Sequence, residues 1–284
     1  MRNSTDKILI TGATGFIGRH LCRQLIRKQF PIEVFEGDIR CFEDLKQHAD
    51  ISIIIHLAAR VRGHYTKEEI EQVNVAGTEN VLKFACQQKA KVIHASSYLY
   101  ASAGDLPLSE DTATSYWNHY SYTKWKAEQK ILQYHTESGL EALILRIFNA
   151  YGPEQQLGYL IPDLIDGLQK GCMHLRNTSP RRDFIHVDDI VDLILKGCKK
   201  QWSGFLPVNV GTGIGYSVME ALELIMELTG QRIPIESDDK PVAIGCAIAN
   251  IETAKKVFDW KPRVTFRNGL KEMLEREGFK NATP

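Results

Sequence analysis

The most constraining feature of the sequence is a glycine-rich turn, Gly12-x-x-Gly15-x-x-Gly18, between an apolar run and an amphipathic segment. We expect a strand at Ile8 to Thr11 and a helix at Ile17 to Lys28. In that setting Gly12 suits a tight turn, Gly15 lets backbone approach a pyrophosphate, and Gly18 permits close helix–strand contact. Backbone N–H groups at a helix start attract phosphate. The turn therefore predicts dinucleotide binding rather than packing alone.

The rest of the chain has the rhythm of an α/β protein. Up to about Phe148, short apolar runs alternate with amphipathic segments, which predicts βαβ units around a parallel sheet. The 284 residues suffice for one large domain or two interlocked ones. We expect a Rossmann-type doubly wound parallel sheet and a smaller mixed α/β substrate-binding domain. The first would comprise residues 1–152 with 184–215 returning to it, and the second residues 153–183 and 216–284.

The stretch between the first expected helix and the strand expected at 51–57 is short. Glu36 follows the second expected strand, where a carboxylate can bind the ribose 2′-OH of NAD and repel the 2′-phosphate of NADP. A crossover between parallel strands needs a dozen or more residues, so this stretch lacks room for about one strand. Arg19 and Arg40 are possible partners of a 2′-phosphate. The cofactor is therefore NAD(H) or NADP(H), and the sequence does not choose between them.

Charge and composition restrict the partners of the chain. The 35 basic and 35 acidic residues cancel, so no broad basic field is available for nucleic acid or an anionic membrane. The six cysteines are scattered without CxxC spacing, which argues against a disulfide framework and a zinc site, and we expect no metal. No apolar run approaches the roughly 18 residues of a membrane span. We expect a soluble, cytoplasmic protein.

Tyr120 and Lys124 are four residues apart and share one face of an expected helix. A lysine cation one turn away, helped by the positive nicotinamide ring of a cofactor, favours the phenolate of the tyrosine. Such a tyrosine can move a proton while the cofactor moves a hydride, as alcohol–ketone interconversion requires. Ser96, at the end of a neighbouring expected strand, can fix the reacting oxygen. The spacing alone is a weak signal, because Tyr122 and Lys126 repeat it.

Several ordered motifs together resemble those of the extended short-chain dehydrogenases/reductases. That family includes NAD-dependent nucleotide-sugar epimerases, dehydratases and ketoreductases, and the resemblance spans nearly the whole chain. The matching segments are Gly12-x-x-Gly15-x-x-Gly18, His56-Leu-Ala-Ala59, Asn74-Val-x-Gly-Thr78, Ser96-Ser97-x-x-Tyr100, Tyr120-x-x-x-Lys124, Leu145-Arg-x-Phe-Asn149, Arg182-Asp-Phe-Ile-His-Val-Asp-Asp189 and Asn209-Val-Gly-Thr-Gly213.

The resemblance implies which residues contact the cofactor. The glycine turn would hold the pyrophosphate, Asp38 and Ile39 would border the adenine, and the segment ending at Ala59 would line the groove. The implied cofactor-binding residues are Gly12, Gly15, Phe16, Ile17, Gly18, Glu36, Asp38, Ile39, Leu57, Ala58, Ala59, Asn74, Tyr120 and Lys124.

The resemblance also implies the reacting and substrate-binding groups. It selects Tyr120 and Lys124 over the second pair. It assigns the catalytic serine to Ser96, four residues before the tyrosine of a Leu-Tyr-Ala segment. A nucleotide diphosphate sugar would be the substrate, and Arg182 would bind its diphosphate through a fork of donors. The implied substrate-binding residues are Ser97, Asn149, Arg182 and, as a point charge, Lys240.

Several reactions are compatible with these motifs. A 4,6-dehydratase needs extra carboxylates where Ser97 and Tyr98 stand, so it is disfavoured. A ketoreductase and an epimerase share the serine, tyrosine and lysine, but only the reductase must exchange its cofactor each cycle. The short stretch near Glu36 should remove adenosine contacts, which favours a 4-keto-6-deoxy nucleotide-sugar reductase acting at C4. The alternative is a 4-epimerase with tightly held NAD. Because the catalytic set is complete, a non-catalytic dinucleotide sensor is disfavoured. The resemblance also implies a homodimer.

Overall fold

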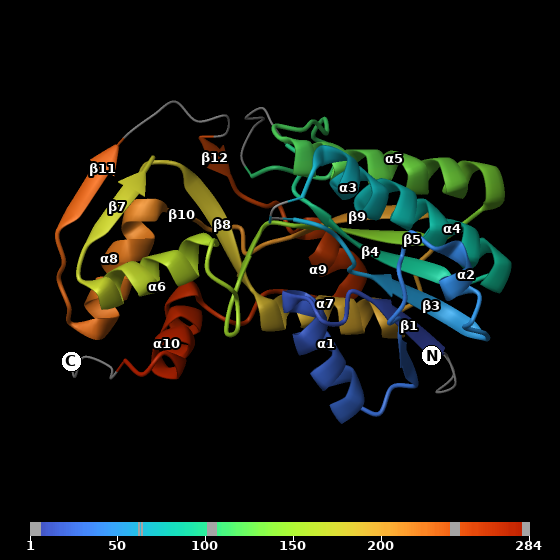
Figure 1. Ribbon diagram of the computed structural model, residues 1–284, viewed down its shortest axis with the longest axis horizontal. Coiled ribbons are helices and arrows are strands. Elements are labelled where there is room, and N and C mark those ends of the chain that lie inside the picture. The colour runs from blue at the N-terminus through green and yellow to red at the C-terminus, as the bar shows by residue number, and fades with distance from the viewer. Residues whose placement is uncertain (1–6, 62, 64, 101–106, 239–244, 280–284) are drawn as a thin grey trace.

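The structure is a computed structural model (Figure 1). It describes residues 7–61, 63, 65–100, 107–238 and 245–279. A large sheet flanked by helices lies beside a smaller unit built mainly from later parts of the chain (Figure 1). Within the described residues, no helix combines the length and the apolar character needed to cross a lipid bilayer.

Six strands form the large sheet in the order β2-β1-β3-β4-β5-β9, and every neighbouring pair is parallel. The middle strands are buried along almost their whole length, as a sheet covered on both faces requires. The expected Rossmann-type parallel sheet is therefore confirmed. Its strands are β1 (Lys7–Thr11), β2 (Ile32–Val34), β3 (Ile51–His56), β4 (Lys91–Ser97), β5 (Ala142–Ile147) and β9 (Phe205–Val210).

Alternate side chains of each strand pack against helices on opposite faces of this sheet. Ile8 and Ile10 of β1 belong to one apolar cluster, which includes α1 and α7, whereas Leu9 belongs to another with α4 and α5. Because the strands are parallel, their carboxyl ends all meet at one edge, where ligands of such folds bind. The four helices are α1 (Phe16–Arg27), α7 (Val187–Lys199), α4 (Gly77–Gln88) and α5 (His119–Ser138).

The large sheet is short by one strand at its β2 edge. Between β2 and β3 the structure has only the one-turn helix α2 (Phe42–Leu45), and β2 pairs with β1 alone. The chain thus crosses over β1 and enters β3 directly. This confirms the shortage expected from the sequence, and it leaves the end of the cleft beside β2 without a further strand.

The segment after β3 is one continuous helical stretch. In it α3 (Lys67–Glu71), a π-helical turn η1 (Gln72–Ala76) and α4 follow without a break. A capping box of Thr66 and Glu69 opens this helix. One extra residue per turn in a helix shifts the side chains that follow, and such π-bulges are frequent at functional sites.

The smaller unit has its own apolar core between helices and short strands. Strand β8 pairs with β6, β10 and β12, while β7 pairs with β11. Strand β6 directly follows β5 and leads the chain from the large sheet into this unit. Its elements are β6 (Asn149–Tyr151), α6 (Leu160–Lys170), β7 (Met173–Arg176), β8 (Arg181–His186), β10 (Gly215–Ser217), α8 (Val218–Thr229), β11 (Ile235–Asp238), β12 (Cys246–Ala247) and α10 (Phe266–Arg276). Helix α9 (Glu252–Phe258) packs instead against the large sheet, in the same apolar cluster as α1 and α7.

Candidate functional site

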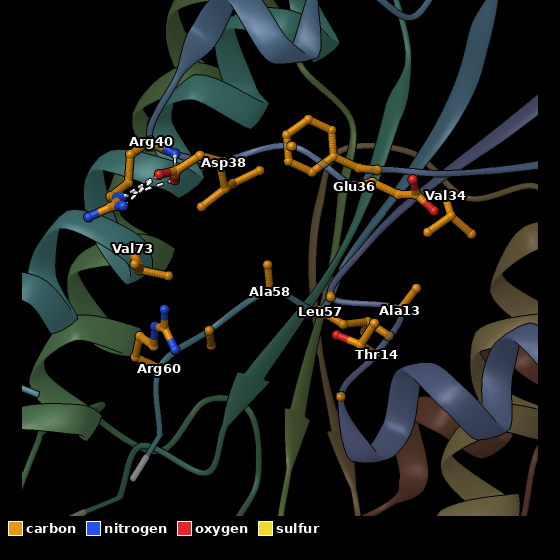
Figure 2. A pocket seen from close by; sticks show the side chains of 16 residues that line it. Ala13, Thr14, Val34, Glu36, Asp38, Arg40, Leu57, Ala58, Arg60 and Val73 are labelled. Atoms are coloured by element: carbon orange, nitrogen blue, oxygen red, sulfur yellow. Dashed lines mark hydrogen bonds and ion pairs between the residues drawn. The ribbon is translucent and has the colours of Figure 1, made fainter. Parts of the chain in front are cut away.

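A cleft of about 650 Å³ lies at the carboxyl ends of β1, β2 and β3 (Figure 2). Asn74 is buried below this cleft, and Phe16, Ile17 and Gly18 form the first turn of α1 beside it. The cleft is lined by most of the residues expected to hold the cofactor: Gly12, Gly15, Glu36, Asp38, Ile39, Leu57, Ala58 and Ala59.

The three glycines of the turn have different tasks. Gly12 has φ +73°, and a Cβ on it would lie 2.5 Å from the Ala58 nitrogen. A Cβ on Gly18 would lie 2.2 Å from the Gly12 carbonyl oxygen, so both positions are closed to larger residues by packing. A Cβ on Gly15 would have only that carbonyl oxygen nearby, at 3.2 Å, and Gly15 lines the cleft. No side chain caps the start of α1 and no acidic residue occupies its first turn, so its N–H groups can receive phosphate.

The β2 side of the cleft carries two carboxylates in different states. The Glu36 side chain is exposed and makes no hydrogen bond or ion pair with any described residue. Asp38 accepts from Arg40 Nε at 2.9 Å and from Arg40 Nη2 at 2.5 Å. This guanidinium lowers the pKa of Asp38 to about 2. Arg40 is thus engaged by a neighbour, whereas Glu36 is available to a ribose.

Two further arginines differ in their relation to the cleft. Arg19, considered above as a 2′-phosphate partner, donates to the Thr14 carbonyl oxygen at 2.7 Å and to that of Glu154 at 3.2 Å. It does not line the cleft. Arg60 does line it, with its guanidinium 4.2 Å from the ring centre of Tyr65 (Figure 2). The sequence motifs did not single out Arg60.

A buried chain of hydrogen bonds fixes the ends of β1 and β3. The Ala58 N–H donates to Thr11 Oγ1 at 3.3 Å, and the Thr78 hydroxyl donates to the Asn74 carbonyl oxygen at 2.7 Å. Between them, Thr11 Oγ1 lies 2.7 Å from His56 Nδ1, and His56 Nε2 lies 3.0 Å from Thr78 Oγ1. These partners assign the imidazole proton to Nε2. Burial lowers the pKa of His56 to about 3, so the ring stays neutral.

Asn74 uses its whole amide to join three parts of the site. Its Oδ1 accepts the Arg60 N–H at 2.7 Å, and its Nδ2 donates to the Arg60 carbonyl oxygen at 2.9 Å and to Thr123 Oγ1 at 3.0 Å. Asn74 lies within the π-helical turn. It therefore positions the loop after β3 against α5, and a direct cofactor contact by its side chain remains only an expectation.

Tyr120 and Lys124 lie near the start of α5, at the carboxyl edge of the sheet. Lys124 is 3% exposed, and its Nζ donates to the Ala95 carbonyl oxygen at 2.8 Å and lies 6.0 Å from the Tyr120 ring centre. Burial lowers the pKa of Lys124 to about 8. Burial, with a smaller contribution from Tyr159, raises the pKa of Tyr120 well above its ordinary value. The sequence reasoning missed Tyr159, which precedes α6.

The second tyrosine–lysine pair belongs to the surface. The Lys126 ammonium lies 4.8 Å from the Tyr122 ring centre and also pairs with Glu71. Tyr122 stacks with Trp125 at a centroid distance of 6.4 Å. The pair that reaches the sheet edge is therefore Tyr120 and Lys124.

Ser96 is in a buried ion-pair cluster rather than at the cleft. Its hydroxyl donates to Glu128 Oε1 at 2.5 Å, and Arg146 Nη2 donates to the other oxygen of that carboxylate at 2.9 Å. All three side chains are buried. In this arrangement the Ser96 hydroxyl proton is directed at Glu128, and its role in fixing the reacting oxygen stays a prediction.

The expected substrate-binding residues are divided in space. Asn149 lies in β6 and Arg182 in β8; both act to lower the pKa of Tyr98, which burial raises. Ser97, the last residue of β4, is half-buried. Lys240 lies outside the described residues.

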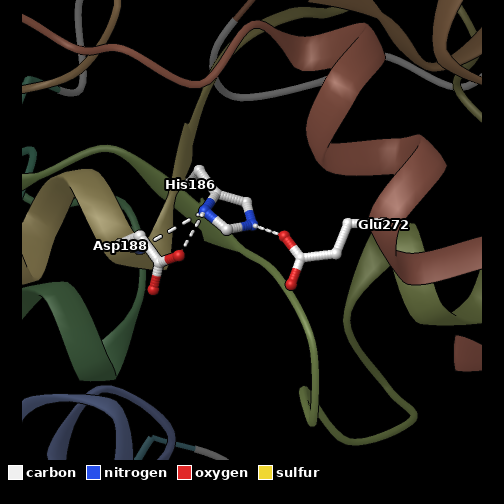
Figure 3. A group of neighbouring side chains, drawn as sticks. All are labelled: His186, Asp188 and Glu272. Atoms are coloured by element: carbon white, nitrogen blue, oxygen red, sulfur yellow. Dashed lines mark hydrogen bonds and ion pairs between the residues drawn. The ribbon is translucent and has the colours of Figure 1, made fainter.

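His186, Asp188 and Glu272 form a compact polar group between α7 and α10 (Figure 3). His186 Nδ1 accepts the Asp188 N–H at 3.3 Å, which leaves the ring proton on Nε2, 3.6 Å from Glu272 Oε2. The two carboxylates thus face opposite nitrogens of the ring, and one cation cannot take a single imidazole nitrogen together with both. The geometry fits a capped helix start.

The fold and the cleft define a Rossmann-type protein whose cofactor is NAD(H) or NADP(H). Three features fit that ligand: Gly12 and Gly18, which admit no Cβ, the uncapped N–H groups at the start of α1, and the carboxylate of Glu36 on the ribose side. Residues 8–211 match the model of the NAD dependent epimerase/dehydratase family. The match covers well over half of the chain, which therefore belongs to this family.

The chain also matches individual proteins over most of their length. GDP-6-deoxy-D-talose 4-dehydrogenase of Aggregatibacter actinomycetemcomitans is 29% identical over 262 residues, covering 84% of this chain and 88% of that protein. UDP-glucuronic acid decarboxylase 6 of Arabidopsis thaliana is 28% identical over 311 residues, covering 96% and 89%. The structure of MoeE5 in complex with UDP-glucuronic acid and NAD has a TM-score of 0.87 at 27% identity, covering 96% and 100%.

Proposed function

We propose that this protein is an NAD(P)-dependent oxidoreductase that reduces the 4-keto group of a 4-keto-6-deoxy nucleotide sugar. The observation that carries the proposal is the pair of Tyr120 and Lys124, held by α5 at the same sheet edge as the dinucleotide cleft. A bound reduced cofactor would supply the hydride for the carbonyl carbon. The Tyr120 hydroxyl would give its proton to the carbonyl oxygen, and the Lys124 cation would stabilise the phenolate that results.

The protonation of Tyr120 supports the reductive direction. Reduction begins with a proton donor, whereas removal of a hydride from an alcohol begins with a phenolate that accepts a proton. Burial raises the pKa of Tyr120, so the phenol stays protonated before the reaction. A neutral reduced nicotinamide leaves this state undisturbed, while an oxidised one lowers the pKa by its positive charge.

The relatives support the substrate class. One is named for dehydrogenation at C4 of a GDP-6-deoxyhexose, which is the reverse of the reduction proposed here. Another relative and a structural neighbour are named with UDP-glucuronic acid. A nucleotide diphosphate sugar also fits the guanidinium of Arg182, which lies beyond the sheet edge in β8.

The direct test is reduction of a 4-keto-6-deoxy nucleotide sugar. Purified protein would be mixed with GDP-, UDP- or dTDP-linked 4-keto-6-deoxy sugars and with NADH or NADPH. We expect stoichiometric loss of the reduced-cofactor absorbance with one of them. If NAD co-purifies and a 4-hydroxy sugar is inverted without net oxidation, the protein is a 4-epimerase and the reductase proposal is wrong.

The role of Tyr120 has a matched control in Tyr122, two residues further along the same helix. Tyr120→Phe should lower turnover by roughly 10²- to 10⁴-fold, the usual value of general acid catalysis, with cofactor affinity preserved. Tyr122→Phe removes the same hydroxyl from the surface pair and should leave turnover within about twofold of the wild type. Equal activities of the two variants would sink the assignment.

We also propose that the protein is a homodimer. The proposal rests on the family resemblance; Tyr116, just before α5, and Leu132 on α5 are 49% and 40% exposed. Light scattering across a concentration series tests this. A mass of one chain at every concentration contradicts it.

A further inference from the structure

His94 is a buried imidazole that takes no part in the proposed proton transfer. Its side chain is 1% exposed, and neither ring nitrogen has a hydrogen-bond partner among the described residues. A neutral imidazole carries one N–H donor and one lone pair, and buried polar groups are almost always paired. Two residues earlier on the same face of β4 stands the buried aliphatic Val92. An apolar side chain would therefore serve packing better at position 94.

The sheet places His94 beside His56. The two residues are paired in register on β4 and β3, and their ring centroids are 5.2 Å apart at an interplanar angle of 35°. Both nitrogens of His56 already have partners, Nδ1 in Thr11 and Nε2 in Thr78. His56 therefore packs against the ring of His94 but has no nitrogen left to bond it.

Lys124 is the charged group closest to this ring along the backbone of β4. Its Nζ donates to the carbonyl oxygen of Ala95, the residue directly after His94, at 2.8 Å. Because side chains of a strand alternate between faces, His94 and Ser96 both point to the α5 side of the sheet. There the Ser96 hydroxyl meets Glu128, which lies one helical turn after Lys124 on α5. The imidazole of His94 and the ammonium of Lys124 thus share the buried layer between β4 and α5.

The other ionisable groups of this layer have fixed charge states. Glu128 of α5 pairs with Arg146 of β5 at 2.9 Å, and the buried side chains that α4 adds are uncharged. Burial raises the pKa of Tyr120, so its phenol keeps the proton. Burial, and then the charge of Lys124, lower the pKa of His94 well below its usual range, so the ring is neutral. The one group of this layer that changes charge near neutral pH is Lys124, whose pKa burial lowers to about 8 against the smaller, opposite effect of Glu128.

We infer that His94 is a positioning residue for Lys124: its neutral ring offers a lone pair to the ammonium and so helps to keep Lys124 charged in a buried layer. This inference rests on the proposed function, in which the Lys124 cation stabilises the phenolate of Tyr120. A lone pair directed at an ammonium favours its charged form, whereas burial without such a partner favours the neutral amine. Without His94, Lys124 should therefore lose its proton at a lower pH.

Titration of the wild-type protein tests the contact without an assay of turnover. In protein labelled with ¹⁵N-histidine, NMR would follow the ring nitrogens of His94 from about pH 5 to about pH 9.5, with the signals assigned by their loss in His94→Gln. We expect the signals of a neutral ring throughout, with a change of chemical shift centred near pH 8, the pKa of Lys124. Lys124→Met should abolish that change. A His94 ring that gains a proton near pH 6.5 overturns the inference, and so does one whose signals stay constant around pH 8.

The pH dependence of turnover gives a readout that a packing role would not move. His94→Phe keeps a ring against His56 and removes both nitrogens, so the alkaline decline of turnover should move about one pH unit lower, a tenfold change in the ionisation of Lys124. His94→Gln restores an acceptor oxygen and should return the decline close to its wild-type position. His135→Phe is the matched control, because His135 lies at the far end of α5 with its Nδ1 2.9 Å from the Leu140 carbonyl oxygen.

The outcomes separate a positioning role from a packing role. A decline that stays at the wild-type pH in folded His94→Phe overturns the inference, and so does an equal displacement in His94→Phe and His135→Phe. If His94→Phe does not fold, His94→Gln and the titration of the wild type decide. If the protein reduces no 4-keto nucleotide sugar, the proposed function fails, while the titration still shows whether His94 faces the Lys124 ammonium.

Discussion

Replacement of single glycines in the turn after β1 separates the packing role of this turn from its binding role. At Gly18 an alanine Cβ would lie 2.2 Å from the Gly12 carbonyl oxygen, a distance that requires backbone movement. At Gly15 the nearest atom would be 3.2 Å away, and the backbone there has φ −71° and ψ 173°, which any residue adopts. Gly18→Ala should therefore lower the free energy of unfolding, and Gly15→Ala should weaken cofactor binding.

The magnitudes follow from the geometry. Forced overpacking of a rigid contact costs about 1–3 kcal/mol or more, which we expect as the loss in free energy of unfolding for Gly18→Ala. For Gly15→Ala, a slight crowding is opposed by about 0.4–1 kcal/mol gained from a less flexible unfolded chain, so the net change should be small. Because Gly15 lines the cleft, a Cβ there would crowd the phosphates expected at the helix N–H groups. Loss of one charge-assisted hydrogen bond, about 1.5–3 kcal/mol, weakens cofactor affinity roughly 10- to 100-fold.

Urea unfolding and NADH titration, each on both variants, measure the two effects independently. Gly139→Ala is a control, because Gly139 ends α5 with φ +72° and open space around it. It should lose about 1–2 kcal/mol of stability from the left-handed backbone and keep its cofactor affinity. The reasoning is refuted if Gly15→Ala binds NADH as tightly as wild type, or if Gly18→Ala unfolds at the wild-type urea concentration.

Three further predictions concern buried ionisable groups. Arg146→Met should cost about 3–5 kcal/mol of stability in urea unfolding, because Glu128 keeps a buried charge without its cation; an unchanged midpoint contradicts this. His56 has a folded pKa of about 3, and burial also lowers that of His94, so both rings are neutral when folded and titrate near pH 6.5 when unfolded. The contribution of these neutral rings to the free energy of unfolding should thus be complete above pH 6.5. Between pH 7 and pH 5 it should fall by about 1.9 kcal/mol for His56, and His94 should add to this loss. Equal urea midpoints at the two pH values would count against this prediction. Turnover should decline as the pH rises through about 8, where Lys124 loses its charge, and a flat pH–rate profile to pH 9.5 would contradict that role.

The large sheet is predictable from the sequence because its signals are local. The run from Ile51 to His56 is almost entirely β-branched and forms a strand buried on both faces. The glycine turn falls between β1 and α1 as expected, and even the missing strand follows from counting residues between α1 and β3. Short strands of the smaller unit give no such signal: β12 has two residues, and its partner β8 lies more than sixty residues earlier in the chain.

The π-helical turn could not be predicted for a related reason. Its central residue, Asn74, is bound to Arg60 and Thr123, which come from the loop after β3 and from α5. Tertiary hydrogen bonds thus favour a helical register that local propensity does not. Capping boxes, by contrast, depend only on residues three apart, and they form at Thr66, Asn118 and Ser217.

Ser96 shows what counting along the sequence leaves out. Its assignment depended on its distance from Tyr100, whereas its side-chain direction depends on how far β4 remains paired with β5. That pairing keeps Ser96 inside the sheet, where Glu128 and Arg146, from two other elements, take its hydroxyl. Arg60 was missed because its place in the cleft depends on Asn74 rather than on a motif.

The direction of the proposed reaction rests on two features that originate in different parts of the molecule. At one end, the sheet stops at β2, so no further strand covers the adenosine side of the cleft, and the exposed carboxylate of Glu36 has no partner among the described residues. An adenosine held by fewer contacts dissociates more readily, as a cofactor consumed in each cycle must.

At the other end, burial keeps the phenol of Tyr120 protonated, as a proton donor must be before hydride arrives. An epimerase would retain its cofactor, and the positive charge of the oxidised nicotinamide would lower the pKa of Tyr120. The two features are independent, since one follows from a shortened crossover and the other from the packing of α5, and the uncovered adenosine side is the one that separates a reductase from an epimerase.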